Sequence, residues 1–239
     1  MRLLLLLCVL TTLVRADFAQ DLARIHTEAV GGSENVQALK TLRATGITRN
    51  ARGDLHFTLW AGRPSQVRTE LASKTRVITQ AWGGGDEGPW SADSETKRIT
   101  LLTGDSAEDF KTEAEFDDPL LAGKDRKIAL DYVGEMKVDG RDLLKIMVTQ
   151  NFTQISYVYL DPASYLIVRR DVIRRRPGGE MTLRTDYGDF RAVAGVLLPH
   201  RLSAYRDGKR LHETVIDRIE PNVKLEALMF ATPTVESTR

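Results

Sequence analysis

Alternating apolar and polar residues are the main pattern of the chain, and the pattern is clearest over residues 53–71. There Leu55, Phe57 and Leu59 alternate with polar residues, which predicts a strand with one buried face. A turn signal at residues 62–65 interrupts the run, and the alternation then resumes, as in a β-hairpin. Because a two-stranded ribbon alone is marginally stable in water, we expect this hairpin to form part of a larger sheet.

Similar alternating runs, separated by turn signals, continue through the rest of the chain. After residue 127 they form a regular meander, in which the dipeptide Asp207-Gly208 is the strongest hairpin signal. The glycine-rich stretch from Trp82 to Trp90 predicts a flexible turn between two large aromatic residues. Together the runs predict about ten or eleven antiparallel strands joined by short connections.

Three stretches have helical spacing instead. Apolar residues from Phe18 to Ala29 recur every three or four positions, with polar residues on the other side, which predicts an amphipathic helix. Gly31-Gly32 ends this helix, and Ser33 can cap a second, short one. A third helix is predicted from Ser106 to Phe116, where acidic residues occupy the first turn.

These elements predict a mainly β fold of the α+β class. A sheet of that many strands twists and curls, so it forms either a closed barrel or a half-barrel with an open mouth. The amphipathic helices near the N-terminus and in mid-chain are available to cover such a mouth. We therefore expect an unclosed, strongly curved antiparallel β half-barrel with helices over its open face. No linker, low-complexity tract or repeat divides residues 17–239, which favours a single domain.

The first residues are typical of a secretory signal peptide. Arg2 precedes an apolar run from Leu3 to Val14. The small residue Ala16, in Val14-Arg15-Ala16, predicts a signal-peptidase cleavage site after Ala16. The run is shorter than the roughly 20 apolar residues that a membrane-spanning helix needs. Anchoring through a lipidated Cys8 is the alternative, but it calls for a small residue just before the cysteine, where this chain has Leu7. We therefore expect export of residues 17–239.

Composition and charge exclude several classes of function. Cys8 is the sole cysteine, so the mature chain would have no disulfide, thiolate metal site or cysteine nucleophile. The formal net charge of +1 falls by two units to −1 without Arg2 and Arg15, so no overall charge attracts nucleic acid or acidic lipid. The arginines at 169–170 and 174–176 are interpreted as a water-facing surface, because acidic residues adjoin them and no aromatic residues suit base stacking.

No motif for catalysis, nucleotides or metal stands out. His26, His56, His200 and His212 are far apart, without the spacing of a metal site. The chain lacks a P-loop, a dinucleotide fingerprint and a Gly-x-Ser-x-Gly elbow. Carboxylates crowd the end of the third predicted helix, which is more typical of a solvated surface than of an acid/base pair; they are Glu113, Glu115, Asp117 and Asp118. We expect no cofactor, no metal and no enzymatic activity.

The hairpin carries Leu59-Trp60-x-x-Arg63-Pro64, which resembles the L-W-x-x-R-P hairpin of the LolA-like family, periplasmic carriers that take lipoproteins to the outer membrane. Other features follow the order of that family: a signal peptide, an N-terminal helix, the Trp82–Trp90 turn, a mid-chain helix and the ending Phe230-Ala231-Thr232-Pro233. The likeness is closest to the broader group of outer membrane lipoprotein-sorting proteins, through residues 28–32, 138–140, 159–162 and 195–200. The chain departs from the pattern at Val67 and Thr69, where the family has aromatic residues.

This resemblance implies an unclosed barrel with a helical lid around an apolar cavity for acyl chains. It implies that Arg63 lies near the cavity and helps to hold the lid, with Trp60 as its aromatic neighbour. An apolar cavity stabilises an acyl chain by roughly 0.8 kcal/mol per buried CH₂. The residues predicted for the cavity or lid are Arg63, Trp60, Pro64, Phe57, Leu59, Trp82, Trp90, Leu120, Leu121, Tyr132, Tyr157 and Met181.

The favoured hypothesis is a periplasmic carrier that binds lipid or lipoprotein acyl chains in this cavity for transfer towards the outer membrane. Its partners would be lipid or lipoprotein, an inner-membrane donor and an outer-membrane acceptor, and we expect a monomer that binds no nucleic acid. Two alternatives stay open on the same fold, a regulatory domain that senses lipoproteins and an enzyme. Polar groups with shifted pKa values in the cavity would favour the enzyme, and an apolar lining the carrier.

Overall fold

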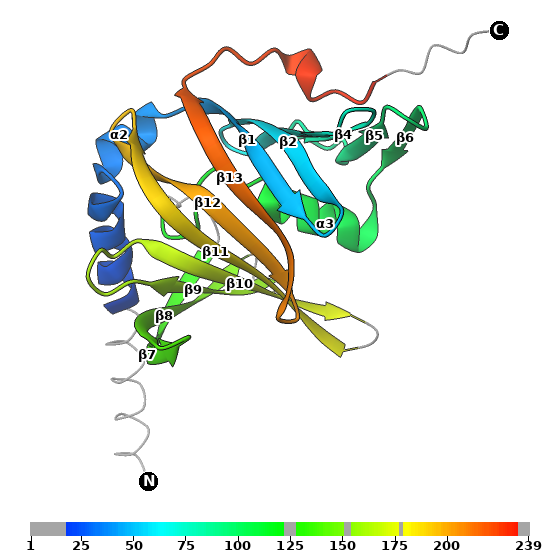
Figure 1. Cartoon of the computed structure of the whole chain (residues 1–239). Helices are drawn as coiled ribbons and strands as arrows, with labels where there is room; N and C mark the ends of the chain where they lie inside the picture. Colours follow the sequence, from blue (N-terminus) through cyan, green and yellow to red (C-terminus); the bar gives the residue numbers. More distant parts are fainter. Residues whose placement is uncertain (1–17, 122–127, 151–153, 177–178, 234–239) are drawn as a thin grey trace, which may run out of the picture. The chain divides into compact units, whose positions relative to one another are not determined.

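The computed structural model describes residues 18–121, 128–150, 154–176 and 179–233. Over these residues the chain forms thirteen strands in one unclosed sheet, accompanied by three α-helices and a 3-10 turn (Figure 1). The order of hydrogen-bonded strands is β6-β5-β4-β3-β2-β1-β13-β12-β11-β10-β9-β8-β7. The predicted fold class, a mainly β chain with an unclosed antiparallel sheet and helices, is confirmed. The predicted signal peptide and its cleavage point lie outside the described residues.

The chain divides into two compact units, each assembled from separate stretches of sequence. Unit 1 comprises the described residues of 1–36, 119–191 and 195–211, and unit 2 comprises those of 37–118, 192–194 and 212–239. The two units are described separately. That residues 17–239 act as a single domain stays a prediction.

Unit 2 contains the predicted hairpin, formed by β2 (Gly53–Gly62) and β3 (Gln66–Ala72), in which Leu59 lies opposite Thr69. Its other strands are β1 (Thr41–Asn50), β4 (Val77–Trp82), β5 (Trp90–Asp93), β6 (Arg98–Leu101) and most of β13 (Lys209–Pro221). The sheet has more strands than the ten or eleven predicted. One reason is β5, whose four residues are too few for alternation to be recognised at the end of the glycine-rich turn.

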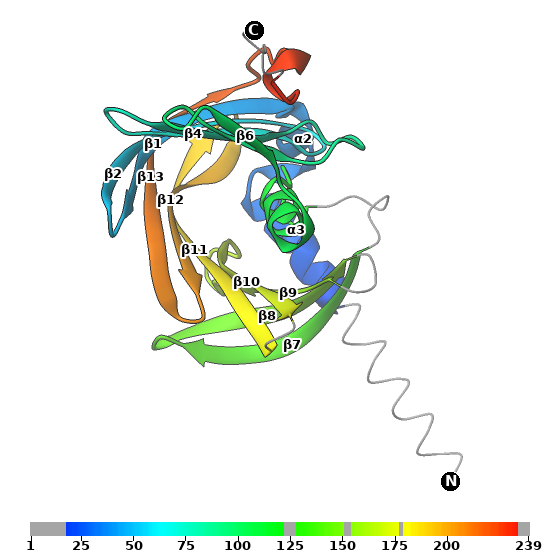
Figure 2. The ribbon, with the colours of Figure 1, turned by 90° about the vertical axis from the view of Figure 1, so that its right-hand side faces the viewer.

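Two segments cover opposite faces of the unit 2 strands. The helix α3 (Gly104–Glu113) lies on one face, where its Phe110 packs against Val67 of β3. The C-terminal segment, residues 222–233, contains the 3-10 turn η1 (Ala227–Met229) and lies on the other face. Figures 1 and 2 show α3 and this segment on the two sides of β1, β2 and β4. We call these faces the α3 side and the tail side.

The tail side is held by hydrogen bonds from side chains of the sheet to main-chain carbonyls of the C-terminal segment. The indole Nε1 of Trp90 donates to the carbonyl of Phe230 at 2.8 Å, and Arg68 Nη1 donates to that of Met229 at 2.9 Å. Trp90 is 2% exposed, so its N–H would be left unsatisfied without the segment. The segment is therefore an integral part of unit 2.

Unit 1 places the N-terminal helix, described over residues 18–29, against a second group of strands. The strands are β7 (Ile128–Val138), β8 (Arg141–Gln150), β9 (Gln154–Leu160), β10 (Ile167–Arg176), β11 (Gly179–Val193) and β12 (Val196–Arg206). Ala19, Leu22 and Ala23 of the helix join a core whose members on β8 and β9 are fully buried. The helix predicted from the spacing of apolar residues is thus present, and its apolar side covers one face of β7, β8, β9 and β10. We call this face of unit 1 the helix side.

The N-terminal helix ends before Gly31-Gly32, as predicted, and the contacts of Gly31 show why glycine is needed there. Gly31 has φ +131°, and a Cβ there would lie 2.0 Å from the carbonyl oxygen of Gly195. The adjacent amide of Leu197 donates to the carbonyl of Val30 at 2.8 Å. The short helix α2 (Gly32–Ala38) follows directly. Glycine is required here by backbone conformation and by this close approach together.

Bulges alter the alternation at several points of the sheet. The pairing of β1 with β13 shifts between Thr45 and Gly46, and that of β7 with β8 shifts between Tyr132 and Gly134. The pairing of β10 with β9 shifts between Ile167 and Arg169. Each shift inserts a residue on one strand and changes which face the following side chains occupy.

Gly46 offers a test of the β1–β13 register. A Cβ at this position would lie 2.0 Å from the main-chain oxygen of Val215, so Gly46→Ala must displace one strand. We expect a loss of about 1–3 kcal/mol in the free energy of unfolding, measured by urea denaturation. Gly188→Ala in β11 is the control, because a Cβ there meets no atom within 4 Å. Equal stability of the two variants would contradict this register.

Candidate functional site

The α3 side of β2, β3 and β4 is a mainly apolar surface, with the polar residues Thr69 and Gln80 in line with Leu59. The register aligns Phe57 with Leu71 and Leu71 with Ile78, while Leu59 and Val67 lie further along the same side. Phe57, Leu71 and Ile78 are partly exposed, so this surface is not fully covered. Apolar groups left in contact with water on a concave or grooved surface are typical of ligand-binding and interaction sites.

The helix α3 covers part of this surface with its own apolar residues. Phe110 and Ala114 are buried against Val67, and Leu59 and Trp82 complete the cluster. The aliphatic and charged positions of α3 are segregated, since Ala107 is also buried while Asp105 and Glu108 are exposed. Such a short amphipathic helix is stabilised mainly by its contacts with the sheet rather than by its own hydrogen bonds.

Arg63, in the turn after β2, fastens the segment that follows α3. Its Nη2 lies 2.7 Å from Asp117 Oδ1, and its Nε donates to the carbonyl of Leu39 at 2.9 Å. The guanidinium also lies 5.1 Å from the centre of the Phe116 ring. We call these four residues, Arg63, Leu39, Phe116 and Asp117, the Arg63 anchor.

The Arg63 anchor corrects one interpretation of the sequence. The crowded carboxylates in the sequence predict that Asp117 belongs to a solvated acidic surface. In the structure its side chain is only 19% exposed, and that of Arg63 is 22% exposed. A partly buried, charge-assisted hydrogen bond is stronger than an exposed ion pair. The sequence shows no signal for this pairing, because the two residues are far apart along the chain and meet only in the folded unit.

Several predicted cavity residues lie on the side of a helix. In unit 2 these are Phe57, Leu59 and Trp82, all on the α3 side. In unit 1, Leu120 belongs to the core beneath the N-terminal helix, and Tyr132 packs on that core with its ring 4.7 Å from the Phe18 ring. The register of β11 and β10 places Met181 on the same side. Leu121 is partly buried, and Pro64 is exposed next to Arg63.

Three other predicted residues lie on the opposite faces. Trp60 and Trp90 are on the tail side of unit 2, where the guanidinium of Arg68 lies 6.0 Å and 5.8 Å from the two ring centres. In unit 1, Tyr157 faces away from the helix side and stacks under Lys145, whose Nζ lies 4.0 Å from the ring centre. These aromatic residues anchor the structure through cation–π contacts, away from the apolar surface.

A polar network occupies this same face of unit 1, opposite the helix side. Arg169 is 6% exposed, pairs with Asp139, and donates from Nε to Asp186 Oδ1 at 2.9 Å. Tyr159 donates its hydroxyl to Asp171 Oδ2 at 2.9 Å. The interpretation that these arginines face water is therefore wrong for Arg169, because buried guanidinium groups require such paired carboxylates.

The network shifts the pKa values of two carboxyl groups in opposite directions. The hydrogen bond from Arg169 lowers the pKa of Asp139, whereas burial raises the pKa of Asp171. Burial also raises the pKa of Tyr159. Because all three groups lie on the face opposite the helix side and are bonded to one another or to Arg169, their pattern is that of a structural network.

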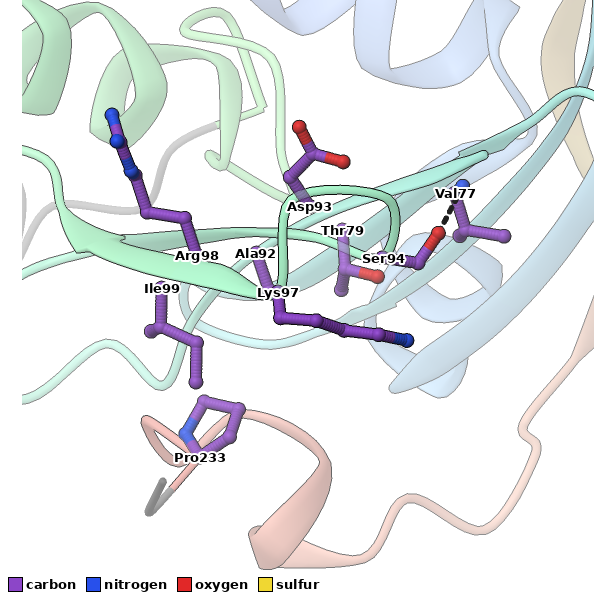
Figure 3. Close-up of a pocket in the computed structure, with 9 residues that line it drawn as sticks. All are labelled: Val77, Thr79, Ala92, Asp93, Ser94, Lys97, Arg98, Ile99 and Pro233. Carbon is purple, nitrogen blue, oxygen red and sulfur yellow. Dashed lines mark hydrogen bonds between the residues drawn. The ribbon is translucent and has the colours of Figure 1, made fainter. Parts of the chain in front are cut away.

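A shallow groove of about 290 Å³ is present on the tail side of β4, β5 and β6. Figure 3 shows the residues that line it: Val77, Thr79, Ala92, Asp93, Ser94, Lys97, Arg98, Ile99 and Pro233. Hydrogen bonds from Arg76 hold the pKa of Asp93 at about 2, with Arg76 Nη2 lying 2.7 Å from Asp93 Oδ2. The groove is separate from the apolar surface, which is on the α3 side.

Within the described ranges, no group of three or more His, Cys, Asp or Glu residues could hold a metal ion. No helix among the described residues combines the length and the apolar character needed to cross a membrane.

The fold is similar to several solved structures at low sequence identity. A Vibrio parahaemolyticus domain described as an outer membrane lipoprotein-sorting protein superposes with a TM-score of 0.60 and 12% identity, covering 90% of this chain and 97% of that one. A LolA superfamily protein from Nitrosomonas europaea gives 0.55 and 11%, covering 89% and 97%. A DUF1329 family protein from Desulfovibrio piger gives 0.61 and 12%, covering 91% and 97%.

The sequence matches no protein-family model and no curated protein. The structural matches cover nearly the whole chain, so the resemblance of the sequence to LolA-like and lipoprotein-sorting proteins is confirmed at the level of the fold. At identities of 11–12% they establish the fold alone.

The Arg63 anchor predicts how firmly α3 is held. Arg63→Leu removes the ion pair and the hydrogen bond to Leu39, which together are worth about 1–3 kcal/mol. We expect the amides of α3 to exchange about 10- to 100-fold faster in hydrogen-exchange measurements. Arg49→Leu is the control, because the side chains of Arg49 and Asp54 are 55% and 61% exposed and 3.5 Å apart. Unchanged exchange in Arg63→Leu would show that the anchor does not hold α3.

The network of unit 1 predicts a pH dependence of stability. An unfolded aspartate has a pKa of about 3.9, and burial raises that of Asp171 in the folded chain. The Asp171 contribution is therefore greatest at low pH and is lost as pH rises through the raised pKa. Asp171→Asn should gain stability relative to wild type over that window, measured by urea denaturation from pH 3 to 8.

Asp139→Asn is the control for this measurement. The pKa of Asp139 is lowered, so its contribution is present above about pH 3.9 and is lost as pH falls through the lowered pKa. The variant should therefore lose stability relative to wild type above about pH 3.9. Two variants with the same pH slope would contradict the assignment of opposite shifts.

Proposed function

We propose that this protein is a periplasmic carrier that binds lipid, or the acyl chains of lipoproteins, on the apolar surface beside α3 and transfers them towards the outer membrane. The observation that carries the proposal is that Phe57, Leu71 and Ile78 are partly exposed on the face of the sheet that α3 covers with its own apolar residues. The predicted signal peptide and the similarity of the fold to LolA-like proteins support a periplasmic location and this class of cargo.

Simple energetics favour displacement of α3 by an acyl chain. The Arg63 anchor contributes about 1–3 kcal/mol, and burial of a phenylalanine such as Phe110 adds about 1.5–3 kcal/mol. An acyl chain gains roughly 0.8 kcal/mol per buried CH₂, so about eight methylene groups outweigh both. We therefore expect a fatty acyl chain to compete with α3 for the apolar surface, and α3 to return when the chain leaves.

This mechanism assigns no catalytic residue. Arg63 acts as a positioning residue for α3, and Leu59 and Val67 act as contacts for either the helix or the cargo. The donor at the inner membrane and the acceptor at the outer membrane would meet the carrier through surfaces other than this one.

The experiment is a lipid-binding assay on the chain expressed without residues 1–16. Native mass spectrometry should detect co-purified lipid, and the protein should take up a fluorescent fatty acid. Leu59→Gln places a polar group on the apolar surface, and we expect at least about a 10-fold loss of affinity. Thr58→Gln is the control, because Thr58 is adjacent to Leu59 in β2 and its side chain therefore points to the tail side.

Circular dichroism and thermal melting establish that both variants are folded. A protein that purifies without lipid and takes up no fluorescent fatty acid would overturn the carrier function. Equal loss of binding in Leu59→Gln and Thr58→Gln would remove the α3 side as the binding surface.

A further inference from the structure

The bulge in β10 sends neighbouring arginines to different faces of unit 1. Ile167 pairs with Leu160 and Arg170 pairs with Val158, and both partners are fully buried in the core beneath the N-terminal helix. Arg169, between them, joins the polar network on the other face. Arg170 therefore lies on the helix side, and its Nε and Nη2 atoms are buried.

A second arginine occupies the same side of the strand. Arg174 pairs with Met181 and is four residues from Arg170, with Val172 between them on the same face. The spacing of strand residues puts the two Cα atoms about 13 Å apart, within reach of one ligand for two long side chains. The apolar Val172 separates the two guanidinium groups, so along β10 the helix side changes from an apolar core to a surface with both apolar and charged side chains.

Ser156 provides an independent observation at this place. It pairs with Val172, next to Arg170 on the register, and is 3% exposed. Its Oγ is buried and has no hydrogen-bond partner among the described residues. A buried hydroxyl without a partner is rare in folded proteins and calls for an explanation such as a bound group.

The chemistry of these three residues fits an anion attached to an apolar chain. A guanidinium has five donors in a fixed fork, so it can keep a partner within the protein and still donate two hydrogen bonds to a phosphate or carboxylate. A serine hydroxyl can donate one more. Val172 and Leu183 lie on the same face, are partly exposed, and can contact methylene groups.

We propose that Arg170, Arg174 and Ser156 form a subsite for the anionic head group, phosphate or carboxylate, of an acyl-bearing cargo. This inference rests on the proposed carrier function and narrows it, because it selects anionic amphiphiles over neutral ones. A subsite of this kind holds the polar end of the cargo, while Val172 and Leu183 on the same face of unit 1 contact the methylene groups next to it.

The test compares ligands that share one tail. Dodecyl phosphate, dodecanoate and dodecanol are titrated into the chain lacking residues 1–16, and binding is measured by native mass spectrometry and calorimetry. We expect both anionic ligands to bind at least about 10-fold more tightly than dodecanol. Inorganic phosphate alone should bind far more weakly than dodecyl phosphate; equal affinity would assign the subsite to free phosphate instead of a lipid head group.

Variants of the chain then test whether the preference for anionic ligands comes from Arg170 and Arg174. The double variant Arg170→Gln, Arg174→Gln should lose the preference for anionic ligands while keeping its affinity for dodecanol. Arg175→Gln is the matched control. Arg175 follows Arg174 in β10, so its side chain lies on the opposite face; it is exposed and is aligned with Glu180 in the strand register. Ser156→Ala, a smaller change, should lower the affinity for anionic ligands by about threefold and leave dodecanol unaffected.

The outcomes separate this inference from the carrier function. Tight dodecanol binding without any preference for anionic ligands, or a preference that survives in the double variant, would overturn the subsite and leave the carrier function standing. Failure of all three ligands to bind the wild-type chain would overturn the carrier function itself.

Discussion

Consecutive side chains of a strand point to opposite faces of its sheet, and the candidate site depends on this alternation. In β2 it puts Leu59 under α3 and Trp60 among the arginines of the tail side. Each face can then be specialised: one is apolar and incompletely covered, while the other is closed by hydrogen bonds to main-chain carbonyls. A slip of one residue in register would exchange the two sets of side chains, so strand pairing positions the site as directly as any local contact does.

The two coverings of unit 2 differ in how easily they can be removed. On the tail side, the buried indole of Trp90 would lose its hydrogen-bond partner if the C-terminal segment left, which is a cost without compensation. On the α3 side, Val67 packs against apolar groups of the helix, and an apolar ligand can take their place. In the proposed mechanism α3 is therefore the cover that cargo replaces, with the Arg63–Asp117 ion pair opposing its removal, while the C-terminal segment stays in place.

Local signals in the sequence were sufficient for most of the elements. The alternation around Phe57 and the helical spacing after Phe18 predicted real elements, because each pattern reports burial within one strand or helix. The Arg63–Asp117 pair and the separation of Arg169 from Arg170 could not be predicted. The first depends on residues that meet only after folding, and the second depends on a bulge that leaves no mark in the pattern of apolar residues.

The strand β7 stands at one end of the strand order, so a neighbouring molecule could in principle add a strand there. The shift in pairing at Val133 interrupts the regular spacing of its main-chain hydrogen-bonding groups, and Asp131 and Glu135 on either side are exposed. An incoming strand would find only short matching stretches flanked by charge. An unclosed sheet is at risk of polymerising through its edges, and this irregular, charged edge disfavours such pairing at β7.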